Sequence, residues 1–170
     1  MRTSLLLSRH GRRERGFTTI ELLVAITIAS ILLGVGIPSY QNFIATQRVK
    51  TAVSDLNYTL MYARSEAIKR NAEVVVAPTG NCWQDGWTVA VGSTTLATQI
   101  GYPDLSIGAA TAPAESISFN GEGRIEGDAT PLEVRSAGSS SVAPRCLSLD
   151  LSGLPSTQLA ACLDAVESCT

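Results

Sequence analysis

The sequence predicts an α+β protein in which one long N-terminal helix is packed on a small antiparallel β-sheet head. Three observations support this fold class. An apolar run covers residues 17–37, an amphipathic pattern with helical spacing continues to residue 71, and turn-forming residues divide the rest into short apolar segments. This last part contains about 100 residues, enough for one hydrophobic core but not for two.

The first 16 residues are polar and basic, with five arginines, one glutamate and the only histidine, His10. The apolar run that follows would measure about 30 Å as a helix, which is the thickness of the hydrocarbon core of a bilayer. Positive residues beside a membrane span favour the cytoplasmic side. We therefore expect the N-terminus to stay in the cytoplasm and the chain beyond the span to be exported.

Glu21 is unusual because a carboxylate inside a membrane span is costly and normally has a partner. Three common export signals do not account for it. A secretory signal, or a twin-arginine signal suggested by Arg12 and Arg13, would need a cleavage site after the apolar run, and residues 34–40 offer none of the A-x-A type. A plain signal-anchor explains the topology but not the acidic residue.

Residues 16–24, GFTTIELLV, resemble the class III signal of type IV pilins and type II secretion pseudopilins. The resemblance implies that a prepilin peptidase cleaves after Gly16 and methylates the new amino group of Phe17. It also implies that the apolar helix is retained and that Glu21 pairs with the N-terminal amine of a neighbouring subunit as the filament assembles. Such a charge-assisted partner makes a buried acid tolerable. The implied partners are the peptidase, other pilins or pseudopilins, and inner-membrane lipid.

We expect four segments: a leader at 1–16, a transmembrane and assembly helix at 17–38, an amphipathic helix at 39–71, and a β-rich head at 72–170. Pro38, with two glycines shortly before it, should kink or loosen the helix. Beyond Pro38, apolar residues recur every three or four positions, so one face of this half should pack on the head. These residues are Val49, Ala52, Val53, Leu56, Leu60, Ala63 and Ala67.

Short apolar segments bounded by turn residues predict the strands of the head. They are residues 73–77, 87–91, 116–119, 123–126, 132–135 and 145–151. The last is the clearest, because Leu147, Leu149 and Leu151 alternate with polar residues and Cys146, which predicts a buried face and an outward face.

Residues 60–71, LMYARSEAIKRN, the strand at 74–76 and the W-x-x-G-W pattern at 83–87 look like the GspH, FimT and FimU group of minor pilins and pseudopilins. Residues 117–123, ISFNGEG, are similar to a later strand and turn of that group. The resemblance implies a low-copy subunit that enters a type IV pilus or type II secretion pseudopilus and starts its assembly or caps its tip. It would thereby serve pilus biogenesis, twitching motility or secretion, in the inner membrane with its head in the periplasm.

Composition argues against an enzyme. After cleavage the chain would contain no histidine, which excludes nucleophiles and zinc sites that depend on imidazole, and we expect neither cofactor nor metal. A membrane-anchored exported enzyme remains an alternative without a visible catalytic cluster. Another is a DNA-uptake receptor, but residues 153–156, GLPS, lack the arginines of a basic turn. The processed chain would hold eight cations against fourteen carboxylates, a net charge of −6, so we expect no nucleic-acid partner.

Four cysteines, Cys82, Cys146, Cys162 and Cys169, lie in the exported part, where disulfides are stable and three complete pairings are possible. Residues 157–169 have apolar positions at helical spacing. If this stretch is helical, Cys162 and Cys169 are about 10 Å apart and cannot bond to each other. Cys146 would then pair with one of them, although four free thiols remain an alternative.

Overall fold

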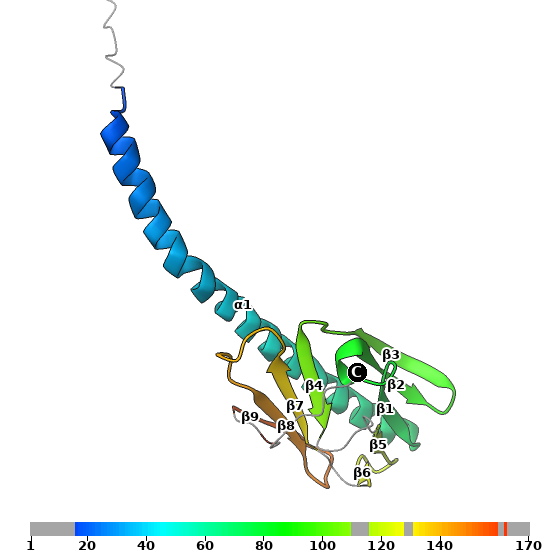
Figure 1. The fold of residues 1–170 in the computed structure, drawn as a ribbon. Coiled ribbons are helices and arrows are strands. Elements are labelled where there is room, and N and C mark those ends of the chain that lie inside the picture. Colours follow the sequence, from blue (N-terminus) through cyan, green and yellow to red (C-terminus); the bar gives the residue numbers. More distant parts are fainter. Residues whose placement is uncertain (1–15, 110–115, 128–130, 160–161, 163–170) are drawn as a thin grey trace, which may run out of the picture. The chain divides into compact units, whose positions relative to one another are not determined.

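The computed structural model describes residues 16–109, 116–127, 131–159 and 162 (Figure 1). Two compact units divide the chain, Met1–Ser39 and Tyr40–Thr170. A single helix, α1 (Thr19–Arg70), contains 52 residues and runs from the first unit into the second. Its first part belongs to the apolar segment and its second part to the head, in agreement with the predicted fold class.

The head is built from two antiparallel sheets. One has the strand order β3-β2-β1-β5-β6 and the other β4-β7-β8-β9. The strands are β1 (Val74–Pro78), β2 (Gly86–Val91), β3 (Thr94–Ile100), β4 (Leu105–Ala109), β5 (Ile117–Phe119), β6 (Ile125–Glu126), β7 (Leu132–Ser136), β8 (Arg145–Leu149) and β9 (Pro155–Gln158). A short 3-10 helix, η1 (Trp83–Asp85), precedes β2.

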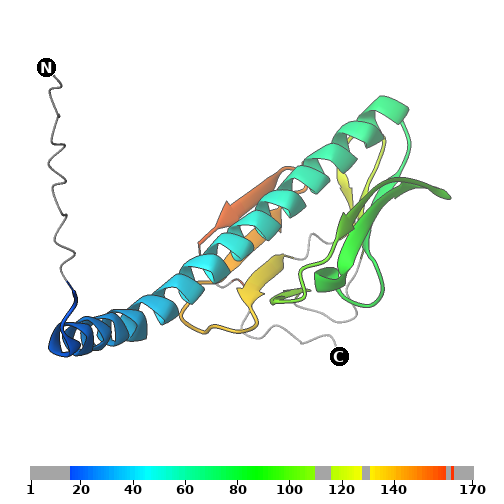
Figure 2. The same ribbon diagram turned by 90° about the horizontal axis from the view of Figure 1, so that it is seen from above.

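One hydrophobic core lies between the helix and both sheets. All seven apolar residues predicted to form the packing face of the amphipathic half are buried. They share a cluster with side chains such as Trp83 and Trp87 near the first sheet and Leu132 and Leu147 in the second. Figure 2 shows the part of α1 after residue 40 lying along both sheets. This face of the helix is therefore the element that unites the two sheets.

Three strands were not predicted. The strand β3 has the sequence TTLATQI, in which polar threonines obscure the alternation expected of a half-buried strand. In β4 a glycine, Gly108, interrupts a short apolar segment. The strand β9 begins at Pro155 and lies at the edge of its sheet, where proline is tolerated. It includes residues 157 and 158, so the predicted helical tail is wrong at its start.

The predicted strand at 145–151 extends too far, and the exposure predicted for Cys146 is wrong. The strand β8 stops at Leu149, and Leu151 is 68% exposed because it lies in the turn toward β9. Cys146, predicted on an outward face, is only 5% exposed. The rest of the predicted helical tail, residues 160–161 and 163–169, lies outside the described residues.

Close approaches at two glycines hold the turn after β5 against its surroundings. Gly123 has a φ of +76° and faces Ile68 of α1, and Gly153 has a φ of +79° and faces the carbonyl oxygen of Gly123. A Cβ atom at Gly153 would lie 2.4 Å from that oxygen, so no larger residue fits without a shift. The same oxygen accepts a hydrogen bond of 3.0 Å from Arg64 Nε. Arg64 thus holds this turn on the helix.

Polar side chains tie α1 to the first sheet. Trp87 Nε1 donates a 3.0 Å hydrogen bond to Thr59 Oγ1, and Trp87 stacks on Tyr102 with ring centroids 6.2 Å apart. The Tyr102 hydroxyl donates to Asp55 Oδ2. Burial, followed by the interaction with Asp55, raises the pKa of Tyr102 to about 12. The side chains of Trp87 and Tyr102 therefore help to hold α1 on the first sheet.

The raised pKa of Tyr102 predicts a loss of stability at alkaline pH. Because an unfolded tyrosine loses its proton near pH 10, the contribution should be complete below that pH and disappear as pH rises toward about 12. We expect Tyr102→Phe to have a free energy of unfolding about 1 kcal/mol lower at pH 8, measured by urea titration. Above pH 10 its stability should decline less steeply with pH than that of the wild type. Tyr58→Phe, at a side chain that is 72% exposed, is the control and should follow the wild type. Parallel declines in all three proteins would contradict this prediction.

Candidate functional site

The predicted processing site precedes the helix. Residues 16–18 are not helical, and α1 begins at Thr19. Phe17 is 72% exposed, and a Cβ placed on Gly16 would meet nothing within 4 Å. The peptide bond between Gly16 and Phe17 therefore lies in exposed, irregular backbone, which is the form that a peptidase can reach.

Glu21 forms a reciprocal cap with Thr18. The Thr18 main-chain N–H and hydroxyl both donate to Glu21 Oε2, at 3.0 and 2.8 Å, and the Glu21 main-chain N–H donates to Thr18 Oγ1 at 3.3 Å. This is the capping box that fixes a helix start. Its T-x-x-E spacing was visible in the sequence, but the sequence analysis did not use it. Within the described part of the chain, no hydrogen bond reaches Glu21 Oε1.

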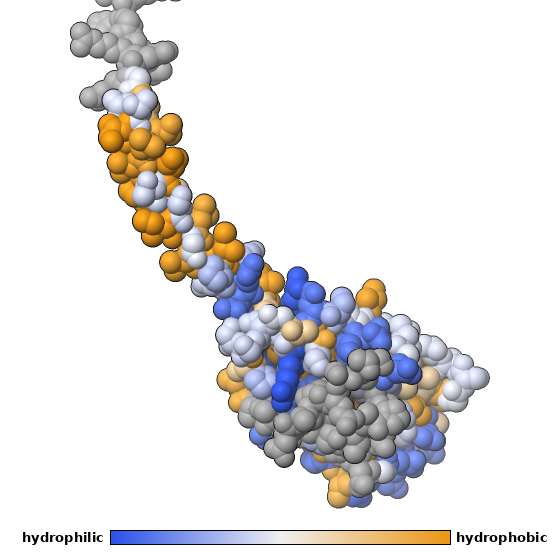
Figure 3. Space-filling view, in the orientation of Figure 1, coloured by the Kyte–Doolittle hydropathy of each residue, from blue (hydrophilic) through white to orange (hydrophobic). Residues whose placement is uncertain are grey.

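The helix beyond the cap is apolar on all sides and has no packing partner within the described residues. Twelve large apolar side chains from Phe17 to Ile37 are exposed, each by more than half. Figure 3 shows this band along the first part of α1. By length and composition α1 can cross a membrane, with a mean hydropathy of 2.4 in its most apolar window. A surface of this kind needs lipid or other helices around it.

Two polar side chains within the band bond to the helix itself. Thr27 Oγ1 donates to the carbonyl oxygen of Leu23, and Ser30 Oγ donates to that of Ile26, both at 2.7 Å. Pro38 lies inside α1, which continues on both sides of it. The expected kink at Pro38 remains a prediction. Glu21 is the one carboxylate of the band, and one of its two oxygens, Oε2, is bonded within the cap.

Charges at the C-terminal end of α1 are paired locally. Glu66 is buried and accepts hydrogen bonds from Lys69 Nζ at 3.1 Å and Arg70 Nε at 2.6 Å. These bonds, that from Arg70 above all, lower the pKa of the Glu66 carboxyl. In the described residues, no group of three or more potential ligands could hold a metal ion. The charged side chains at this end of the helix therefore pair with one another in a structural role.

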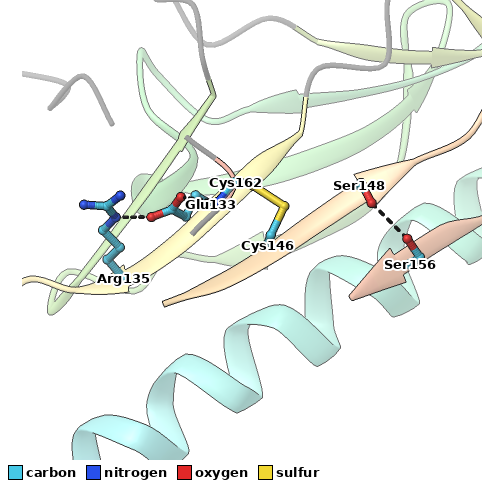
Figure 4. The surroundings of a disulfide bond; sticks show 6 residues. All are labelled: Glu133, Arg135, Cys146, Ser148, Ser156 and Cys162. Atoms are coloured by element: carbon cyan, nitrogen blue, oxygen red, sulfur yellow. Dashed lines mark hydrogen bonds and ion pairs between the residues drawn. A yellow bond between two sulfur atoms is a disulfide. The ribbon is translucent and has the colours of Figure 1, made fainter. Parts of the chain in front are cut away.

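The structure shows which cysteine is bonded to Cys146. Cys146 and Cys162 form a disulfide with a Cα–Cα distance of 5.4 Å (Figure 4). Cys82 is also disulfide-bonded. Cys169 lies outside the described residues. The pairing of Cys146 with Cys162 is one of the two that the sequence allowed for Cys146.

Glu133 is a buried acid beside this disulfide that the sequence analysis missed. Its side chain has no exposed surface, and it lies opposite Cys146 in the register of β7 and β8. Arg135 Nε donates to Oε1, and the Cys162 main-chain N–H donates to Oε2 at 2.9 Å. In the sequence, Glu133 alternates with Leu132 and Val134, a pattern that indicates a solvent-exposed position. The structure instead buries it, with hydrogen bonds from Arg135 and from the Cys162 main chain.

Two family profiles match the chain. The profile of the type II transport protein GspH matches residues 52–153, which is more than half of the chain. The profile of the prokaryotic N-terminal methylation motif matches residues 11–37. The first covers the head and the second the segment around Gly16, Phe17 and Glu21.

Solved structures and curated relatives agree with these profiles. Two crystal structures of the type IV minor pilin FimU of Pseudomonas aeruginosa share the fold at 22% identity, with TM-scores of 0.58 and 0.57, covering 75% and 71% of this chain and 99% of each FimU chain. A fimbrial protein of the same organism is 37% identical over 68 residues, 40% of this chain and 44% of the relative. The type IV major fimbrial protein FimA of Dichelobacter nodosus is 33% identical over 88 residues, 50% of this chain and 56% of the relative. The chain thus spans about half the length of these curated relatives.

Proposed function

Because the chain belongs to the GspH family, matched over residues 52–153, we propose that it is a minor pilin or pseudopilin that inserts its N-terminal helix into a filament. The filament is a type IV pilus or a type II secretion pseudopilus, and the subunit starts its assembly or caps its tip. The observation that carries the proposal is the uniformly apolar, unpacked first part of α1, with a single capped carboxylate near its start.

Glu21 is the group that we assign to assembly. Its Oε2 atom accepts the two hydrogen bonds from Thr18. Its Oε1 atom accepts none from the described residues and can accept one from another subunit. The amine of Phe17 from an adjacent subunit can therefore bind Oε1 while the cap remains formed. Charge-assisted hydrogen bonds are stronger in surroundings of low dielectric. This contact would therefore stabilise an incoming helix in the axial position that brings its amine to Glu21.

The topology that we propose rests on the basic leader before the apolar band. The basic leader remains in the cytoplasm, where prepilin peptidase cleaves after Gly16 and methylates Phe17. The band crosses the inner membrane once, and the head lies in the periplasm. A disulfide between Cys146 and Cys162 is compatible with that oxidising compartment.

Processing is the first expected result. The mature protein should lack residues 1–16 and carry about one extra methyl group, because the site at Gly16 and Phe17 is exposed and irregular. Intact-mass measurement on membranes from cells with an active prepilin peptidase checks this. The same cells without the peptidase are the control and should retain the full-length chain. A full-length chain in both strains would contradict the assignment.

Filament entry tests the function itself. The processed protein should occur in sheared filaments at a low ratio to the major subunit, and deletion of its gene should reduce filament number. Loss of surface pili with intact protein secretion would assign it to a type IV pilus, and the reverse would assign it to a secretion pseudopilus. Wild-type levels of both processes in the deletion strain would overturn the proposal.

A further inference from the structure

The second sheet carries a buried cluster on the face opposite to the hydrophobic core. In the β7 and β8 register, Leu132 pairs with Leu147 on the core side, and the next pair, Glu133 with Cys146, lies on the other side. Figure 4 shows Cys162 next to both members of this second pair. Cys162 therefore makes two different contacts with one pair of residues, a covalent bond through Sγ to Cys146 and a main-chain hydrogen bond to Glu133.

We propose that Glu133 selects Cys162 as the disulfide partner of Cys146 during oxidative folding. With four cysteines in the exported part, Cys146 has three possible partners, and chain entropy alone discriminates weakly among them. A fixed acceptor beside Cys146 that binds the main chain of Cys162 brings its thiol to the correct place before the covalent bond exists. Glu133 is thus a positioning residue.

The physical basis is a buried, charge-assisted hydrogen bond. Glu133 has no exposed surface, so its bond to the Cys162 N–H, at 2.9 Å, lies in surroundings of low dielectric where it is strong. Arg135 supplies a neighbouring positive charge to the same carboxylate, which offsets the cost of burying it. The acceptor is attached to a sheet strand, whose ladder holds it opposite Cys146.

The oxidation step needs an external disulfide, such as glutathione disulfide. The thiolate of one protein cysteine attacks it, forming a mixed disulfide and releasing one glutathione thiolate. The second protein thiolate then attacks the protein sulfur of the mixed disulfide, which forms the Cys146–Cys162 bond and releases the second glutathione. Two electrons pass to the oxidant, and the two thiol protons are left with the released glutathione or with water. Glu133 changes no bond, and it determines only which thiol is near.

The test is reoxidation of the full chain in detergent. The protein is reduced with dithiothreitol, transferred to a glutathione redox buffer and blocked with N-ethylmaleimide, and its disulfides are mapped by peptide mass spectrometry. In the wild type, Cys146–Cys162 should dominate. Glu133→Leu should lower the ratio of this pair to all other pairs of Cys146 by about tenfold, the value of one charge-assisted hydrogen bond. Glu133→Gln keeps a neutral acceptor and should lower it by about two- to threefold.

Two control variants separate positioning from stability. Arg135→Gln leaves the acceptor in place but removes its charged neighbour, so it should lower the melting temperature and lower the pairing ratio by no more than the two- to threefold expected of Glu133→Gln. Glu126→Gln changes an exposed carboxylate on β6 and should alter neither. Wild-type pairing in Glu133→Leu overturns the proposal, as does a loss of pairing in Arg135→Gln as large as in Glu133→Leu. If Glu133→Leu does not refold, Glu133→Gln decides, and wild-type pairing in that variant also overturns it.

Discussion

Replacing Glu21 by Ala is expected to leave the subunit in the membrane and to reduce its amount in sheared filaments at least about tenfold. Membrane retention should persist, or improve, because a costly charge is removed from the span. Filament entry should fall because the neighbouring amine loses its charge-assisted acceptor, and one such hydrogen bond changes an equilibrium by about tenfold or more. Immunoblots of sheared filaments and of membranes, in strains with equal expression, give the two quantities.

Matched variants in the same helix make this result specific. Ser30→Ala removes a polar group of the apolar band whose hydroxyl bonds only to its own helix at Ile26, so filament entry should be unchanged. Thr18→Ala removes the hydroxyl half of the cap and should have an effect smaller than that of Glu21→Ala. Equal incorporation of Glu21→Ala and the wild type would refute the pairing of Glu21 with the amine.

The largest effect on folding is expected at Leu60, which is fully buried between α1 and the sheets. Leu60→Ala should lower the free energy of unfolding of the head by about 3 kcal/mol, because it loses apolar burial and leaves a cavity. Urea unfolding of a fragment of residues 40–170, followed by tryptophan fluorescence, measures this, since Trp83 and Trp87 are both fully buried. We expect that fragment to fold as an acidic monomer, because the packing face of α1 has its core within the same unit.

The adjacent residue is the control for Leu60. Met61 lies one position along α1 and is 43% exposed, so Met61→Ala should cost less than about 1 kcal/mol. Two similar losses would mean that the burial of Leu60 does not account for its effect on the stability of the head. Unchanged stability in Leu60→Ala would show that the fragment does not use this core.

Much of the fold could be predicted because its signals are local and periodic. The apolar run of residues 17–37 and the seven-residue packing face after Pro38 predicted α1, which spans Thr19–Arg70. Strands with a clear apolar signal were predicted to within a residue or two, such as β1, a continuous apolar run, and β7, which alternates. Strands β3 and β9 were missed because polar threonines and an initial proline give no local signal, and only pairing with β2 and β8 stabilises them.

The residues of the candidate site could also be predicted from local sequence. Gly16, Phe17 and Glu21 stand out in the sequence because an acid in an apolar run and an abrupt polar border are visible in a few consecutive residues. The cap between Thr18 and Glu21 is equally local, and its spacing is readable. These features belong to one helix start and need no distant contact.

Tertiary structure alone decided the role of Glu133 and the choice between Cys162 and Cys169 as the partner of Cys146. In the sequence, an acid between two apolar residues indicates an exposed strand position, and cysteine spacing leaves the pairing open. The fold places a strand, its neighbour and a segment 29 residues further along the chain around one carboxylate, which buries it and binds it to Cys162. Local periodicity predicted α1 and the strands with a clear apolar pattern, whereas burial of a charge depends on contacts between segments far apart in the chain, which no local pattern contains.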